Sequence, residues 1–196
     1  NGDEVEGTVG TPIFQGDVIA TKASGSLEIL FADDTTFSLG EDGRMVIDEM
    51  VYDPAGKTGS ASLNVVQGVF AFVSGKIAKT GEDAMTISTP VATIGIRGTT
   101  ASGNAQQEGS ANTFTLLPDA DGGVGIVAIQ TSVGVITLTV PLASTQVTSA
   151  FAPPLPPVIL PPAAVQQIYG SVAATVAVGA PGGGGDTPGG PANVAA

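Results

Sequence analysis

The stretch Thr89-Pro90-Val91-Ala92-Thr93-Ile94-Gly95-Ile96-Arg97-Gly98-Thr99 is the most informative part of this sequence. It places one arginine and two glycines inside an apolar run rich in β-branched residues, which no simple strand or helix pattern predicts. Pro90 cannot donate a hydrogen bond to a sheet ladder, so it marks a sheet edge or a change of chain direction. The stretch therefore indicates a strand with constrained ends in a β-rich protein.

Short β-rich runs separated by turn signals surround this stretch. Leu27, Ile29 and Phe31 alternate with other residues, as do Phe37 and Leu39, which predicts a hairpin with its turn at Asp33-Asp34. Adjacent acids in such a turn are typically solvated turn formers. Further strands are expected within 62–78 (two strands, with bends at Gly68 and Gly75), 85–96, 113–117, 125–130 and 133–140, the last two joined by a turn at Thr131-Ser132.

The composition favours one β domain with appendages. The chain has 196 residues, 42% of them hydrophobic, and small residues outnumber the scarce aromatics. Because large side chains are scarce, the core layers should be thin and built from β-branched side chains. We therefore expect an all-β fold, either β-solenoid-like or a sandwich. Residues 1–150 are predicted to form the β domain, 151–162 a Pro-rich extended connector, 163–178 a short helix or strand, and 179–196 a Gly/Pro-rich tail.

The formal charge of −12 narrows the choice of partners. Only six residues are Lys or Arg, which is too few for the basic patch that nucleic-acid binding requires. The sequence has no run of eighteen apolar residues, so membrane insertion is not expected. Twelve of the eighteen carboxylates precede Pro54, so the remainder is nearly neutral and is expected to meet another protein. Asn1, without a preceding methionine or signal peptide, suggests a processed or excised segment, and export before this sequence begins is one interpretation.

The missing residue types argue against an enzyme. The chain has no histidine or cysteine, which excludes Ser-His-Asp and Cys-His machinery and imidazole or thiolate metal sites. Asp119 and Asp121, followed by two glycines, match a fragment of a calcium loop, but the later ligands are absent. We therefore expect no cofactor, with calcium at Asp119 and Asp121 as the weaker alternative. No glycine-rich stretch has the spacing of a nucleotide site.

Arg97 invites two interpretations. It is one of six basic residues, and flanking glycines allow its backbone to approach other groups closely. It could bind a partner, or it could hold the fold by bonding several carbonyls or a carboxylate with its planar guanidinium. The structural interpretation is favoured, because a buried charge tolerates missing partners poorly.

Three motifs together resemble the FecR domain of bacterial extracytoplasmic proteins. The strongest is the segment with Thr89, Pro90, Gly95, Arg97, Gly98 and Thr99, and Gly16-Asp17-Val18-Ile19 resembles the start of the family pattern. The hairpin pattern Leu-x-Phe-x-Asp-Gly-Thr is matched by Ile29, Phe31, Asp33 and Thr35. Ile29 replaces its leucine and Asp34 its glycine, which leaves the turn type open.

The resemblance implies an all-β extracytoplasmic module, which in the regulators that name the family helps to transmit a siderophore-receptor signal to an anti-sigma apparatus. This sequence shows no cytoplasmic helical region or transmembrane helix, so we expect instead a non-enzymatic, secreted or cell-surface component that self-assembles as a filament, matrix or adhesin. Its partners would be copies of itself or another surface protein, contacted through Val172, Val176 and Val178. The alternative is a periplasmic signalling module with a different protein partner.

Overall fold

One long strand, β5 (Thr58–Val73), runs through both halves of the structure. In this computed structural model, which describes residues 4–172, the first half of β5 pairs with β4 (Arg44–Asp53) and, in parallel, with β6 (Met85–Ser88). Its second half pairs with β3 (Thr36–Leu39) and β8 (Thr100–Ala105). The strand changes neighbours around Gly68, whose φ is +107°.

The prediction of two strands within 62–78 was therefore wrong. Gly68 redirects the backbone without ending the strand, because β4 and β6 support the chain before it and β3 and β8 support it afterwards. The other strands are β1 (Val18–Ala20), β2 (Leu27–Leu30), β7 (Thr93–Arg97), β9 (Asn112–Leu117), β10 (Ile126–Gln130), β11 (Val135–Leu138), β12 (Ala143–Val147) and β13 (Val158–Ile159).

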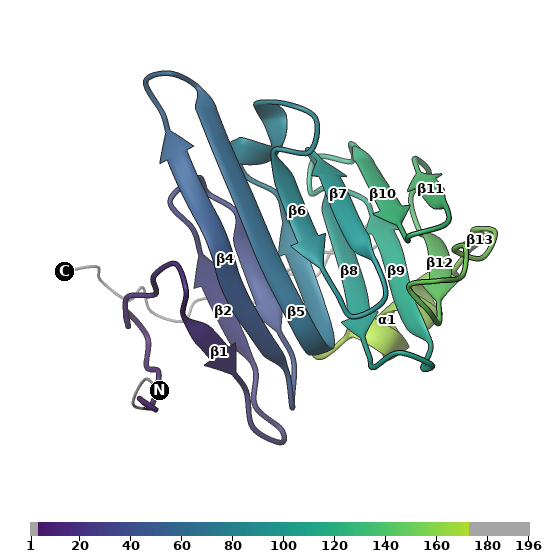
Figure 1. The fold of residues 1–196 in the computed structure, drawn as a ribbon, viewed down its shortest axis with the longest axis horizontal. Helices are drawn as coiled ribbons and strands as arrows, with labels where there is room; N and C mark the ends of the chain where they lie inside the picture. The colour runs from purple at the N-terminus through teal and green to yellow at the C-terminus, as the bar shows by residue number, and fades with distance from the viewer. Residues whose placement is uncertain (1–3, 173–196) are drawn as a thin grey trace, which may run out of the picture.

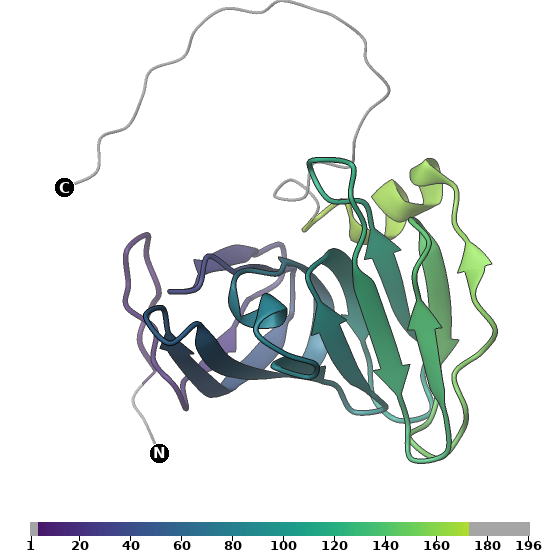
Figure 2. The same cartoon turned by 90° about the horizontal axis from the view of Figure 1, so that it is seen from above.

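The strands form a curled half-barrel whose two halves share β5 (Figures 1 and 2). One half follows the order β1-β4-β5-β6-β7-β10-β11, and the other follows β2-β3-β5-β8-β9-β12-β13. All strand pairs are antiparallel except β5 with β6. The all-β prediction is confirmed, as are the hairpin β2–β3 and the strands expected near 113–117, 125–130 and 133–140.

A single large core fills the concave side of the half-barrel. On the second half of β5, Phe70 and Phe72 point into this core, and the ring of Phe70 stacks on Phe37 with centroids 5.7 Å apart. The alternate residue Ala71 points to the opposite, outer face. This half of β5 is thus buried on both sides, which requires a cover on the outside.

The cover is the helix α1 (Pro162–Tyr169), which packs Val165 and Tyr169 against Ala71 and Leu117. It begins at prolines, whose fixed φ suits a first helical turn, so the segment expected as helix or strand begins as a helix. Strand pairing sets a row of small residues beneath it, which allows a close approach: Ser38, Ala71, Ser102, Thr115 and Ser144.

The segment 151–162, predicted as a Pro-rich extended connector, is part of the sheet. Its two-residue strand β13 pairs with β12, and Leu155 donates its N–H to the carbonyl oxygen of Gln146 at 2.9 Å. Proline is tolerated here because an edge strand needs hydrogen bonds on one side only. This segment therefore fixes α1 to the β domain.

Candidate functional site

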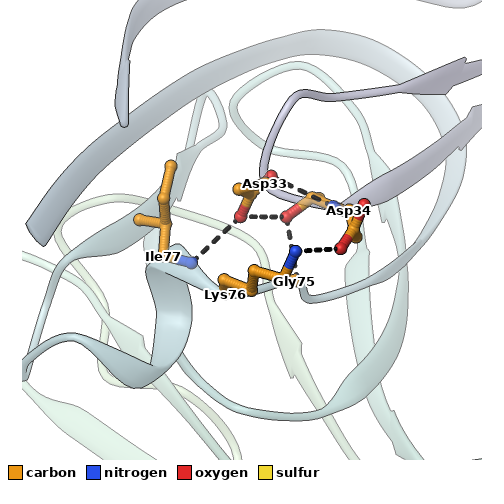
Figure 3. Close-up of polar contacts among 6 residues, drawn as sticks. Asp33, Asp34, Gly75, Lys76 and Ile77 are labelled. Atoms are coloured by element: carbon orange, nitrogen blue, oxygen red, sulfur yellow. Dashed lines mark hydrogen bonds and ion pairs between the residues drawn. The ribbon is translucent and has the colours of Figure 1, made fainter. Parts of the chain in front are cut away.

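A buried carboxylate joins the β2–β3 hairpin to the end of β5 (Figure 3). Asp33 has no exposed surface, and its carboxylate accepts hydrogen bonds from Thr35 N–H at 3.0 Å, Thr35 Oγ1 at 2.8 Å and Ile77 N–H at 3.1 Å. Its backbone carbonyl accepts the N–H of Lys76 at 2.8 Å. The expectation of a solvated turn acid was wrong for Asp33, because backbone donors from two segments replace water.

The neighbouring positions complete this arrangement, which we call the Asp33 clamp (Asp33, Thr35 and residues 75–77). Thr35 Oγ1 accepts the N–H of Gly75 at 2.9 Å, and a Cβ at Gly75 would overlap the Asp33 carbonyl oxygen. Asp34 occupies the left-handed region with φ +68°, which explains why the family pattern has glycine there. Its exposed carboxylate pairs with Lys76 Nζ at 2.5 Å, and their hydrogen bond raises the pKa of Lys76.

The start of the 89–99 stretch makes the connection between β6 and β7. Thr89 and Ala92 close it: the Thr89 N–H donates to the Ala92 carbonyl at 2.8 Å, and the Ala92 N–H donates to Thr89 Oγ1 at 3.2 Å. Pro90 lies at the bend and Val91 is buried in the core. The predicted change of direction at Pro90 is confirmed, and the single run expected over 85–96 is two strands.

The end of the same stretch takes the chain from one half of the barrel to the other. Gly98, with φ +58°, lies between β7 and β8, which belong to different halves. Thr99 donates its N–H to Ser74 Oγ at 2.7 Å, and its Oγ1 accepts the N–H of Gly125 at 3.1 Å. A Cβ at Gly125 would overlap the Gly98 carbonyl. Thr99 thus ties three segments together at this corner.

Arg97 contributes less than the sequence suggested. Its Nη1 lies 3.0 Å from Glu82 Oε1, but the two side chains are 38% and 77% exposed. An exposed pair of this kind adds little to stability. A Cβ at Gly95 would meet Asp83 Oδ1 at 3.2 Å, so this position lies close to the residue that follows Glu82. The carboxylate partner expected for Arg97 is present, but at the surface.

The calcium candidates lie in the turn between β9 and β10. Asp119 Oδ1 accepts the hydroxyl of Thr100 at 2.7 Å, and Asp121 Oδ1 accepts the N–H of Gly123 at 2.9 Å. Both carboxylates thus have roles within the fold. Over residues 4–172, no group of three or more His, Cys, Asp or Glu side chains is placed to hold a metal ion.

The residues proposed for assembly are only partly described. Val172 is 2% exposed and packs with Tyr169 and Val165 on its own sheet, so its side chain is covered by its own chain. Val176 and Val178 lie outside the described residues.

Two open hollows mark the described surface. The first, of about 380 Å³, is lined by 89–93, 130–132 and Ala150, none of which is ionisable. The second, of about 430 Å³, has Glu41 and Asp42 among polar residues. The Asp33 carboxylate reaches neither and already accepts three donors. Within 4–172, no helix is long and apolar enough to cross a bilayer.

A comparison with protein families tests the family resemblance that the sequence motifs indicated. The family described as FecR protein matches residues 17–117, just over half of the chain. This chain belongs to the FecR family. The match begins at β1 and ends with β9, so it contains the Asp33 clamp and the whole 89–99 stretch. The FecR motifs of this chain are therefore the parts that connect strands and halves of the barrel.

Solved structures share the fold of this chain. Two are described as a "putative anti-sigma factor" from Parabacteroides distasonis ATCC 8503, with TM-scores of 0.55 and 0.53. Each is 14% identical, and the match covers 71% of this chain and 58% of that chain. The chain thus spans less than two thirds of those proteins, and the likeness is one of fold. No curated protein matched.

The comparisons favour the signalling alternative over the self-assembling surface filament. Sequence reasoning missed the partners of the motifs, Ser74, Gly75, Ile77 and Gly125, because each is distant in sequence from the motif it supports. Gly75 carried a usable signal: a glycine in or near a strand often permits a close backbone approach.

Proposed function

We propose that this chain is the extracytoplasmic protein-interaction module of a FecR-type signalling regulator, without catalytic activity of its own. The match of the FecR family to residues 17–117 carries this proposal. The likeness in fold to the described anti-sigma factor supports it. In this role the half-barrel binds another protein of a sigma-factor pathway and passes on the state of a receptor.

The physical features of the described surface agree with this role. The hollow beside Pro90 and Thr131 is uncharged and open, as is common where one protein chain rests on another. The Asp33 clamp and the Thr99 corner consist of internal hydrogen bonds, which hold the barrel rigid. A rigid scaffold with open, neutral surface is suited to binding without chemistry.

Transcript profiling in the bacterium that produces the chain tests this proposal. In-frame removal of residues 17–117 should change a discrete set of transcripts that share one promoter type, since an anti-sigma pathway controls promoter choice. Re-expression of the unchanged protein should restore them. An unchanged transcript profile, with altered surface architecture instead, would contradict the signalling role and favour a structural component.

A further inference from the structure

Charge is distributed unevenly between the two ends of the half-barrel. Twelve of the eighteen carboxylates precede Pro54 and belong to the part that contains β1 to β4. From Gly122 to Val172, by contrast, no residue is Asp, Glu, Lys or Arg. Figure 1 shows β1 and β4 at one end of the molecule and β11 and β13 at the other. One end therefore carries most of the acidic residues. The opposite end, which we call the neutral end, carries few charges; one of them is Glu108, whose carboxylate accepts the N–H of Ala150 near the turn before β11.

The neutral end carries an open strand edge. β11 pairs with β10 on one side and ends that half of the sheet. At the turn between β10 and β11, Thr131 donates its N–H to the Gly134 carbonyl, so Thr131 and Gly134 form a hydrogen-bonded pair. By the alternation of antiparallel pairs, Val135 and Thr137 direct their N–H and C=O groups away from β10. Among the described residues, no other strand pairs with that edge.

This edge strand is short, at four residues, but it otherwise lacks the usual protection against pairing. Natural edge strands are blunted by lysine, proline or bulges, whereas β11 reads Val-Ile-Thr-Leu and its register with β10 is regular. Val135 is 62% exposed, and the same charge-free segment of the sequence has other exposed apolar side chains: Val133, Val140, Phe151 and Leu155. An unprotected, uncharged edge of this kind is a template for another strand.

We propose that the partner at this edge is β11 of a second copy, so that the FecR module forms a closed, two-fold dimer. A two-fold axis at Ile136 sets Val135 of each copy opposite Thr137 of the other. Both residues direct their backbone groups outward, so each pair exchanges hydrogen bonds in both directions. The two half-sheets become one continuous sheet.

The charge distribution allows a second copy as the occupant at this end only. Two chains of net charge −12 repel each other, and contact through the neutral ends keeps the acidic ends farthest apart. The interface has no ion pairs, so added salt should preserve or strengthen it by screening the residual repulsion. The acidic ends are not complementary to each other, and the assembly therefore stops at two copies instead of growing into a filament.

Sedimentation velocity of the full 196-residue chain over a range of concentrations tests this proposal. The unchanged chain should show a monomer–dimer equilibrium. Val135→Lys should weaken dimerisation by about tenfold or more, because it places like charges beside the paired strands. Thr137→Pro removes an outward N–H without breaking the β10 ladder and should also weaken the dimer. Far-ultraviolet circular dichroism confirms that both variants are folded.

Val51→Lys is the matched control. Val51 lies on β4 and is 55% exposed, similar to Val135, but it belongs to the acidic end. This variant should dimerise like the unchanged chain. A monomer at every concentration, or a dimer that neither β11 variant weakens, would overturn the proposal. The inference does not rest on the signalling role: a monomeric chain that still controlled transcripts would refute the dimer alone.

Discussion

The carboxylate of Asp33 accepts a hydrogen bond from the backbone N–H of Ile77 at 3.1 Å, although 44 positions separate the two residues. This bond fixes the β2–β3 hairpin to the segment that leaves β5, and so closes one side of the core. It also explains why the hairpin motif needs an acid at this position: a carboxylate offers several acceptor sites to converging backbone donors.

Asp33→Ala should lower the free energy of unfolding by about 2–4 kcal/mol, because it leaves buried donors of Thr35 and Ile77 without an acceptor. Urea denaturation measures this loss. Asp34→Asn is the control, since Asp34 is exposed and asparagine tolerates its positive φ. It should change stability by no more than about 0.5 kcal/mol. Equal effects of the two substitutions would contradict the clamp.

Gly75→Ala should destabilise the fold by about 3 kcal/mol, because its Cβ would overlap the Asp33 carbonyl and lie 2.5 Å from Thr35 N. Gly81→Ala provides the comparison, as nothing lies within 4 Å of a Cβ there. Thermal unfolding followed by circular dichroism should separate the two variants clearly. A Gly75→Ala variant as stable as Gly81→Ala would show that the backbones do not approach as described.

Thr99→Val should cost about 1–2 kcal/mol, because the half-buried N–H of Gly125 loses its acceptor. Arg97→Gln should change the stability by at most about 0.5 kcal/mol, since its ion pair with Glu82 is exposed. Thr99 and Arg97 lie in the same motif. Chemical denaturation of both variants therefore shows which of the two residues stabilises the fold. A larger loss from Arg97→Gln would restore the structural interpretation of the arginine.

Stability should also fall at high pH through Tyr169. Burial raises the pKa of Tyr169 to about 12 from an ordinary 10.0, although the hydrogen bond with Thr115 opposes the rise. Below about pH 10 this contribution is fully present, and it is lost as the pH rises through about 12, because the unfolded chain ionises first. The loss amounts to about 3 kcal/mol at most.

Tyr169→Phe removes this pH dependence and isolates it from other groups that titrate in the same range. In a Tyr52→Phe background, Tyr169 is the only tyrosine of the chain, so its absorbance reports its ionisation directly. Ionisation of Tyr169 near pH 10, with the fold intact, would argue against the packing of α1 on the sheet.

The parts of the fold that follow from local patterns were predictable. Alternation at 27–39 predicted the β2–β3 hairpin, and Pro90 predicted either a sheet edge or a change of direction. The passage of β5 from one half-sheet to the other was not predictable. Gly68 lies in a continuous strand with positive φ, and the local sequence around it is equally compatible with a bend between two strands.

The structural roles of the FecR motifs could not be predicted, because they depend on residues that are distant in sequence. Asp33 was interpreted as a solvated turn acid because its donor at Ile77 is remote in sequence. Arg97 drew attention through its charge, whereas the neutral Thr99 makes the bonds that hold the corner. Val172 was assigned to assembly because the sequence gives no sign that Ala71 and Leu117 lie beneath it.

The most direct test of the signalling role measures transcripts in strains that express variants with an intact or a destabilised fold. In a strain that lacks the native module, the unchanged protein and Gly81→Ala should both restore the affected transcripts, whereas Gly75→Ala should not. Immunoblots would show how much of each protein accumulates. Transcripts that are the same with and without the module would contradict the claim that this FecR domain works in a regulatory pathway.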